Sequence, residues 1–202
     1  MITNIIIAIT VFASITTMDN YVLKNKLMFN AYMINNSREW YRFFTNAFIH
    51  ADWMHLIFNM FSLYMFGGAV EKGYLSMFGE KGVLFFILLY VGGIVMSSMY
   101  SYEKQKNNIS YNALGASGAV SAVIFAYIIM APTTKLMFLF LPVPIPAYLF
   151  GVIYLGAEYY MSKRGNDNIG HDAHFWGAVF GVVFTIVLKR ELIHSFIEQI
   201  IG

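Results

Sequence analysis

Long apolar windows, separated by segments that carry the charges, dominate the chain. Six windows approach the length needed to cross about 30 Å of hydrocarbon at about 1.5 Å of rise per helical residue. They cover residues 3–21, 53–70, 82–102, 113–131, 145–160 and 169–188. The pattern predicts an all-α, polytopic membrane protein of six transmembrane helices, and we expect residues 1–202 to form a single membrane domain.

The connections between these windows differ in character. The first connection, residues 22–52, is long and rich in aromatic residues, including the stretch EWYRFFTNAFIH. We expect a short amphipathic segment at the membrane interface, where Trp and Tyr are favoured, rather than a mobile loop. The connection that holds Pro142, Pro144 and Pro146 is expected to be non-helical or kinked. Residues 189–202 form a short tail.

Composition supports the bilayer as the solvent and excludes several classes of function. Hydrophobic residues make up 58% of the chain and charged residues 12%, against about 25% charged in soluble domains. The net charge of +2 provides no basic field for nucleic acid. The absence of cysteine excludes disulfides, zinc–thiolate sites and thiol catalysis. A cytoplasmic N-terminus would leave most Lys and Arg residues on the opposite side, so charge alone does not set the orientation.

Polar residues recur at the start of alternate windows. His55 and Asn59 open the second window at a spacing of i,i+4, Ser117 lies early in the fourth, and His171 and His174 open the sixth. Alternate windows run in the same direction, so these groups are expected at a similar shallow depth below one membrane face. A single intramembrane Ser or Asn is more often a packing residue, but this combination favours a functional site.

Small residues suggest how the fourth and sixth windows could meet. They recur every fourth position in both windows, as Gly118, Ala122 and Ala126 and as Gly177 and Gly181. Such stripes allow helix backbones to approach closely in lipid, and they are expected to bring Ser117 within hydrogen-bond reach of His174.

The resulting constellation is suited to acyl transfer. His174 is the candidate base that activates the Ser117 hydroxyl, and then the acid for the leaving amine. The Ser117 amide at a helix N-terminus, together with His55 and Asn59, could stabilise an oxyanion. Gly115, together with Gly118, would let the backbone turn tightly. Asp172 is expected to point away from His174, so the sequence predicts a Ser–His dyad without a third carboxylate.

These residues resemble the rhomboid family of intramembrane serine proteases. The resemblance rests on H-x-x-x-x-H-x-x-x-N, on G-x-S-G, on H-x-x-G-x-x-x-G, on an Arg in the first connection and on a GGAVE run. In this chain they are His50, His55 and Asn59; Gly115 to Gly118; His174, Gly177 and Gly181; Arg42; and the run that ends at Glu71. Where many members carry an aromatic residue one turn after the serine, this chain has Ser121.

The resemblance implies a compact six-helix fold, both termini cytoplasmic, including a cytoplasmic tail at 189–202, and an active site that opens to the extracytoplasmic side. It implies Ser117 and His174 as catalytic residues, with His55 and Asn59 as oxyanion donors. Supporting positions would be Gly115, Gly118, His50 and His171, the last as second-layer or oxyanion support, and Arg42 and Glu71 would hold the first connection in place. The substrates would be transmembrane proteins, cleaved without metal or cofactor. The minimal six-span form would place the protein in a cell membrane, the bacterial plasma membrane.

Two other functions remain open at this stage. A catalytically inactive rhomboid-like protein could bind membrane helices, although such proteins usually lack the Ser or the His. A metal site or transporter could be built from the histidines at 50, 55, 171 and 174. Against the metal site, the sequence has no H-E-x-x-H and no intramembrane acid that is clearly available as a ligand.

Overall fold

The fold is described from a computed structural model, which covers residues 1–138, 141–164 and 170–202. Helices make up most of this part of the chain, and one antiparallel hairpin accompanies them. The predicted helical fold is therefore confirmed, and the two short strands, Lys135–Phe138 and Leu141–Pro146, are an addition to it. The elements are α1 Ile2–Met18, α2 Tyr21–Leu27, α3 Ala31–Ser37, α4 Arg42–Thr45, η1 Asn46–Phe48, α5 Trp53–Ser62, η2 Leu63–Gly67, α6 Gly68–Phe78, α7 Lys81–Gln105, α8 Ser117–Met130, β1 Lys135–Phe138, β2 Leu141–Pro146, α9 Ala147–Arg164, α10 His171–Leu188 and α11 Glu191–Ile201.

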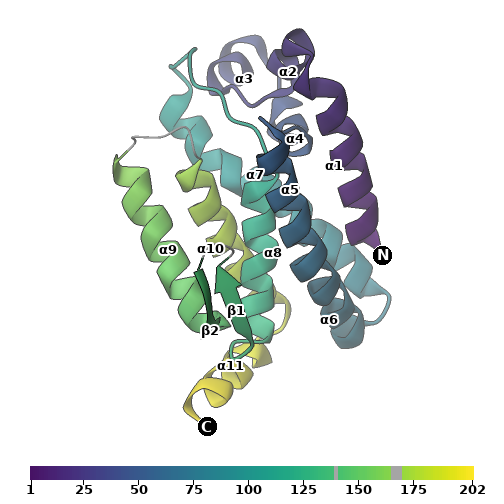
Figure 1. The fold of residues 1–202 in the computed structure, drawn as a ribbon, viewed down its shortest axis with the longest axis vertical. Coiled ribbons are helices and arrows are strands. Elements are labelled where there is room, and N and C mark those ends of the chain that lie inside the picture. Colours follow the sequence, from purple (N-terminus) through teal and green to yellow (C-terminus); the bar gives the residue numbers. More distant parts are fainter. Residues whose placement is uncertain (139–140, 165–169) are drawn as a thin grey trace.

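The longer helices lie side by side in a bundle (Figure 1). The short helices α2, α3 and α4 cover one end of it, and α11 lies at the other end. Three helices in the described residues are long and apolar enough to cross a membrane, Trp53–Phe78, Lys81–Gln105 and His171–Leu188. The helices α1 and α8 are apolar but shorter. The chain is thus a helical membrane protein, and the number of six spans stays a prediction.

The surface of α1 shows the polarity expected of a helix packed in lipid. Its buried face carries hydroxyl residues, Thr3, Thr10, Ser14 and Thr17. Its exposed face carries large apolar residues, Ile5, Ile9, Phe12 and Ile15. Small polar side chains pack well between membrane helices, whereas the exposed apolar face, with Phe12 73% accessible, is suited to contact with hydrocarbon.

The second window extends further than its charges predict. The helix that begins at Trp53 continues through the π-helical turn η2 and α6 to Phe78, past Glu71. Glu71 is buried, and its carboxylate accepts hydrogen bonds from the backbone N–H groups of Ile2 and Thr3 and from the Thr3 hydroxyl, at 2.7, 3.0 and 2.7 Å. The unpaired amides at the start of α1 therefore stabilise the charge. Glu71 joins α6 to α1, rather than holding the first connection as expected.

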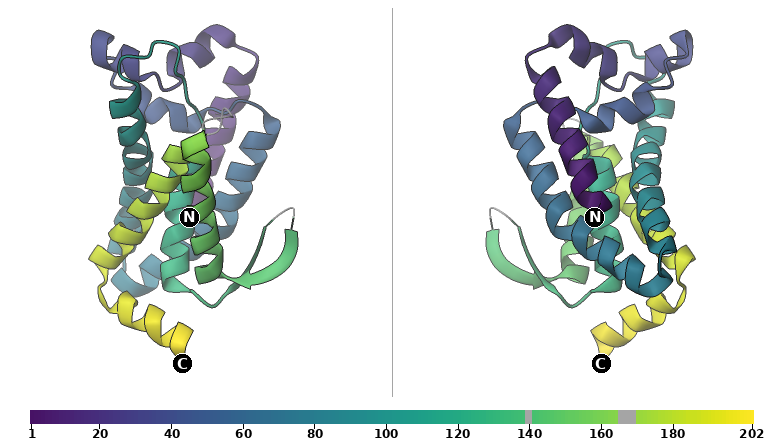
Figure 2. Two further views of the ribbon diagram at one scale, coloured as in Figure 1. Left: turned by 90° about the vertical axis from the view of Figure 1, so that its left-hand side faces the viewer. Right: turned by 90° about the vertical axis from the view of Figure 1, so that its right-hand side faces the viewer.

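The described part of the proline-rich connection is non-helical, as predicted. It forms the antiparallel hairpin of β1 and β2, in which Lys135 pairs with Pro146 and Leu136 with Ile145. Figure 2 shows the hairpin projecting from the side of the bundle. The fifth helix, α9, begins at Ala147, directly after the last proline. The sixth window was predicted from residue 169, which lies outside the described residues, and α10 begins at His171.

The helix α8 lies at the centre of the bundle and contacts α7, α9 and α10. The predicted small-residue stripes meet where α8 crosses α10. A Cβ added to Gly177 would lie 2.1 Å from the Gly118 carbonyl oxygen, and one added to Gly181 would lie 2.1 Å from the Ala122 carbonyl oxygen. The two backbones are thus in direct contact, which only glycine permits at these positions.

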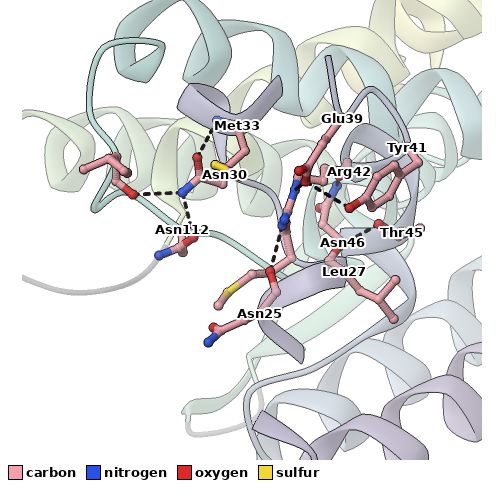
Figure 3. Close-up of polar contacts among 12 residues, drawn as sticks. Asn25, Leu27, Asn30, Met33, Glu39, Tyr41, Arg42, Thr45, Asn46 and Asn112 are labelled. Atoms are coloured by element: carbon pink, nitrogen blue, oxygen red, sulfur yellow. Dashed lines mark hydrogen bonds and ion pairs between the residues drawn. The ribbon is translucent and has the colours of Figure 1, made fainter. Parts of the chain in front are cut away.

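The first connection is folded into short helices rather than being a loop. Arg42 fixes its course, because Nη1 donates to the carbonyl oxygens of Asn25 and Met28 at 2.7 and 2.8 Å, and Nε donates to Glu39 at 2.5 Å (Figure 3). These contacts confirm the structural role expected of Arg42. The aromatic side chain of Trp40 remains 55% exposed, as expected of a residue at a membrane interface.

The first connection also holds the segment that leads into α8. Phe29 and Ala113 exchange two backbone hydrogen bonds of 2.8 and 3.0 Å. Beside them, the Asn30 side chain donates to Asn112 at 3.0 Å (Figure 3). Further along, the Gly115 amide donates to the Asn46 carbonyl oxygen at 2.9 Å. These hydrogen bonds hold residues 112–116 in a non-helical conformation. The sequence predicted a helix from residue 113, but α8 starts at Ser117.

Candidate active site

Ser117 is the first residue of α8, where the chain leaves an extended segment and enters the helix. The first N–H groups of an α-helix have no acceptor within the helix, and they carry the positive end of its dipole. The side chain of Ser117 lines a cavity of about 720 Å³. The hydroxyl thus lies beside backbone donors and in space that a substrate could enter.

His174 lies one turn into α10 and faces Ser117. Its Nε2 is 2.7 Å from Ser117 Oγ, as the meeting of the small-residue stripes predicted. The imidazole also lines the cavity. A hydroxyl and an imidazole at this distance are a nucleophile and a base in hydrogen-bond contact.

A carboxylate that sequence reasoning missed contacts the other side of this imidazole. Glu158 on α9 places Oε1 3.0 Å from His174 Nδ1, and it is only 7% exposed. The prediction of a dyad without a third carboxylate is therefore wrong in its geometry. Asp172 does point elsewhere, as predicted, and accepts hydrogen bonds from Lys104 at 2.8 Å and from Ser162. The available signal was a lone acid in an apolar window, a costly group in lipid.

His55 and Asn59, both on α5, also line the cavity. Asp52 caps this helix by accepting from the His55 amide at 2.8 Å, which sets where the helix begins. Asn59 donates to the His55 carbonyl oxygen at 3.0 Å. Gly115 has φ of +119°, and a Cβ there would lie 2.5 Å from Cε1 of His55. The backbone before Ser117 therefore packs directly on the His55 ring.

His50 lies behind the cavity wall and is fully buried. Its Nε2 accepts from the Ala116 amide at 3.3 Å, so the hydrogen lies on Nδ1 and is donated to Ser14 Oγ at 2.9 Å. Ser14 Oγ in turn donates to the Phe48 carbonyl oxygen at 3.1 Å. Burial lowers the pKa of His50 to about 3, so this ring is neutral at physiological pH. Its contacts are those of a residue that fixes the backbone before Ser117.

His171 is brought to Glu158 rather than to Ser117. Its Nδ1 is 2.5 Å from Glu158 Oε2, and the ring is 5% exposed. Gly118, the other supporting position, packs against Ser97 of α7, whose Cβ would lie 2.4 Å from a Cβ at residue 118. Both residues therefore contribute to packing and orientation around the Ser117–His174 pair.

Glu158 and the two histidines of α10 together resemble a set of metal ligands. Glu158, His171 and His174 each offer one ligand atom, and these atoms all lie within 4.8 Å of one another. Of the two sequence arguments against a metal site, the lack of an available intramembrane acid is wrong, whereas the absence of H-E-x-x-H still holds. Two imidazoles and a carboxylate are a donor set that suits zinc or iron. The histidines at 50 and 55, which the earlier metal hypothesis included, are not part of this group.

Comparison with known proteins gives a consistent result. The Rhomboid domain matches residues 37–191. The chain is similar to RHOMBOID-like protein 12, mitochondrial, of Arabidopsis thaliana, with 29% identity over 181 residues, 80% of this chain and 52% of that protein. It is also similar to Rhomboid protease GluP of Bacillus subtilis, with 28% identity over 142 residues, 70% of this chain and 25% of the relative. Rhomboid protease AarA of Providencia stuartii is 24% identical over 177 residues, 78% of this chain and 59% of the relative.

These similarities cover most of this chain and a smaller part of each relative. The chain spans about half the length of the mitochondrial relative and a quarter of the Bacillus protein. The relatives come from mitochondria as well as from bacteria, so the comparisons support a membrane protein and do not single out the bacterial plasma membrane. The Bacillus and Providencia relatives are named as proteases, whereas the Arabidopsis relative is not.

Proposed function

Because the chain belongs to the rhomboid family, we propose that it is a serine endopeptidase that hydrolyses peptide bonds in or near the transmembrane segments of membrane proteins. The observation that carries this proposal is the 2.7 Å contact between Ser117 Oγ and His174 Nε2 at a cavity. Relatives that are named as rhomboid proteases support the reaction class at the level of the family.

In the proposed reaction, His174 Nε2 takes the proton of Ser117 Oγ as the oxygen attacks the carbonyl carbon of the scissile peptide bond. The tetrahedral intermediate collapses when the C–N bond breaks and His174 returns its proton to the leaving nitrogen. Ser117 then carries the acyl half as an ester. A water molecule, deprotonated by His174, attacks the ester, releases a carboxylic acid and restores the Ser117 hydroxyl.

The negative oxygen of the tetrahedral intermediate needs donors that are already in place. The first backbone N–H groups of α8 lie beside Ser117, and His55 and Asn59 line the same cavity. We assign all three as oxyanion donors. Each donor of this kind typically contributes about 3 kcal/mol to the transition state.

The same proposal includes a topology. We propose six spans, cytoplasmic termini and a cavity that opens toward the extracytoplasmic side, so that water reaches Ser117. The 14 residues of α8 would span only about 21 Å, less than the hydrocarbon core of about 30 Å, which supports a nucleophile recessed below the surface. Transmembrane proteins are the proposed substrates, the bilayer is the surrounding phase, and the bacterial plasma membrane stays a prediction.

A cleavage assay with purified protein in detergent tests the proposal. The substrate is a protein with a single transmembrane segment, and the variants are Ser117→Ala and His174→Ala. Both variants are expected to lower the cleavage rate by more than about 10³-fold, because each removes one half of the nucleophile–base pair. Ser76→Ala and His194→Ala are matched controls, since both residues are exposed and lie outside the cavity.

The outcomes separate the candidate functions. Cleavage by the parent and the controls, with loss in both variants, supports the endopeptidase. Cleavage by Ser117→Ala at the parent rate would remove Ser117 as the nucleophile. A parent protein that binds the substrate without cutting it would favour the inactive helix-binding protein instead.

A further inference from the structure

The described chain contains a buried carboxylate to which the proposed reaction has assigned no role. The two oxygens of Glu158 face two imidazoles of α10, with Oε1 3.0 Å from His174 Nδ1 and Oε2 2.5 Å from His171 Nδ1. A carboxylate away from water is costly unless it is paired and hydrogen-bonded. Glu158 meets this requirement through both of its oxygens, and one of the two partners is the proposed base.

The carboxylate determines where the imidazole protons lie. An ionised carboxylate can only accept hydrogen bonds, so the Nδ1 atom of each histidine carries a hydrogen and donates it to Glu158. For His174, this leaves the lone pair of Nε2 directed at Ser117 Oγ, 2.7 Å away. That tautomer is the one in which an imidazole can accept the proton of a hydroxyl.

A second contact fixes α9 against the helix of the nucleophile. Tyr154 lies one turn before Glu158, and its hydroxyl is 2.9 Å from Ser121 Oγ. Ser121 lies one turn after Ser117 on α8. Adjacent turns of α9 therefore contact both the helix that carries the nucleophile and the helix that carries the base, so Glu158 is held in register with both.

We propose that Glu158 is a positioning residue, which holds His174 in the tautomer and orientation that accept the Ser117 proton and stabilises the imidazolium that forms. This inference rests on the proposed function and deepens it. Glu158 keeps its negative charge throughout, and the proton moves only between Ser117 Oγ and His174 Nε2. His171 holds the second oxygen of Glu158, so that the first stays directed at His174.

The principal test replaces the carboxylate by its amide. Glu158→Gln keeps the size of the side chain but offers one acceptor and one donor, so it cannot accept from both Nδ1 atoms. We expect kcat to fall by about 10²- to 10⁴-fold with little change in KM, because Glu158 acts through His174. Glu158→Asp, which keeps the charge, should recover part of the rate. Glu198→Gln, the same change at an exposed carboxylate on α11, is the matched control.

A spectroscopic readout separates positioning from packing. The chain has five histidines, so ¹⁵N labelling of histidine, with single-histidine variants for assignment, can report the tautomer of each ring. We expect the hydrogen of His174 on Nδ1 in the parent and a changed tautomer population in Glu158→Gln. A Gln variant that keeps the parent's kcat and tautomer, whatever its melting temperature, would overturn the inference. A parent that cuts no substrate would instead overturn the proposed function.

Metal addition tests the competing interpretation of the same three side chains. A metal bound at Nδ1 of His174 would place the hydrogen on Nε2, and the base would be lost. Positioning by Glu158 therefore predicts that chelator leaves the parent's rate unchanged, and that any effect of added Zn²⁺ is inhibition. A rate that falls on chelation and returns with Zn²⁺ would assign Glu158, His171 and His174 to a metal and overturn the positioning role.

Discussion

At the scale of single residues, Gly115 shows how tightly the backbone is built around the site. Its φ of +119° is disfavoured for residues with a side chain, and the His55 ring occupies the place of a Cβ. Two separate causes therefore exclude a side chain at residue 115, the backbone conformation and the contact with the His55 ring. Both follow from the need to bring the turn before Ser117 against the candidate oxyanion donor.

Gly115→Ala should therefore impair cleavage more than it impairs folding. The new methyl group would displace His55 from the cavity wall, and we expect the cleavage rate to fall by about tenfold or more. Gly79→Ala is the matched control, because Gly79 also has a positive φ, +60°, but nothing lies within 4 Å of its added Cβ. Cleavage rates and melting temperatures of both variants check this. Equal rates at equal stability would show that the contact with His55 has no catalytic importance.

The residues of the site could be predicted unequally from the sequence. Ser117 and His174 were found because polar residues open alternate apolar windows, and small residues at every fourth position predicted that their two helices meet. Glu158 was missed because it stands alone in the fifth window, and neither charge nor spacing linked it to the histidines. The only sequence signal for Glu158 was that a charged residue in a membrane span is energetically costly and therefore often functional. Tyr154, one turn earlier, adds a second polar group on the same helix face.

At the scale of elements, the crossing of α8 and α10 sets the distance between nucleophile and base. Gly181→Ala would place a methyl group 2.1 Å from the Ala122 carbonyl oxygen, so the helices must move apart. We expect a loss of about 1–3 kcal/mol of stability and a large fall in the cleavage rate. Thermal unfolding in detergent and the cleavage assay measure both effects.

Gly156→Ala is the matched control for that substitution. Gly156 lies within α9, and nothing lies within 4 Å of an added Cβ. Alanine is the better helix former by about 1 kcal/mol, so this variant should be as stable as the parent or more stable. If Gly181→Ala behaves in the same way as Gly156→Ala, the close contact of α8 and α10 is not what holds the bundle together.

The sequence predicted the apolar helices well and their ends less well. Periodicity and charge located α1, α7 and α10 to within a few residues. The window that ends at residue 70 was too short because the charge of Glu71 is stabilised by the start of α1, a contact between distant parts of the chain. The window that starts at 113 was too long because backbone pairing with Phe29 keeps this segment extended.

At the scale of the whole molecule, His50 links three distant segments. Through Ser14, Phe48 and Ala116 it joins α1, the first connection and the start of α8. Motif spacing marked His50 as a supporting residue, but these partners depend on the assembled bundle. The resemblance to a family could imply such a network, whereas composition and periodicity alone could not.

The pH dependence of stability should report this link. The pKa of His50 is about 3 in the folded protein, against about 6.5 when unfolded, so between these values only the unfolded chain binds the proton. Stability should therefore be full above about pH 6.5 and fall as the pH decreases, by up to about 1.4 kcal/mol per unit. Melting temperatures from pH 7 to pH 4.5 should fall more steeply for the parent than for His50→Gln. Parallel curves would contradict the assignment.

The position of α9 at the edge of the bundle has a consequence for the order of events (Figure 1). The helix that forms this outer wall also carries the carboxylate that supports His174. If α9 moved outward, Glu158 would move away from His174. A substrate that entered from the lipid past α9 would then meet a His174 imidazole without its carboxylate partner. In the proposed reaction, cleavage would therefore require α9 to return to its position, and membrane proteins that contact the site only briefly would not be cleaved.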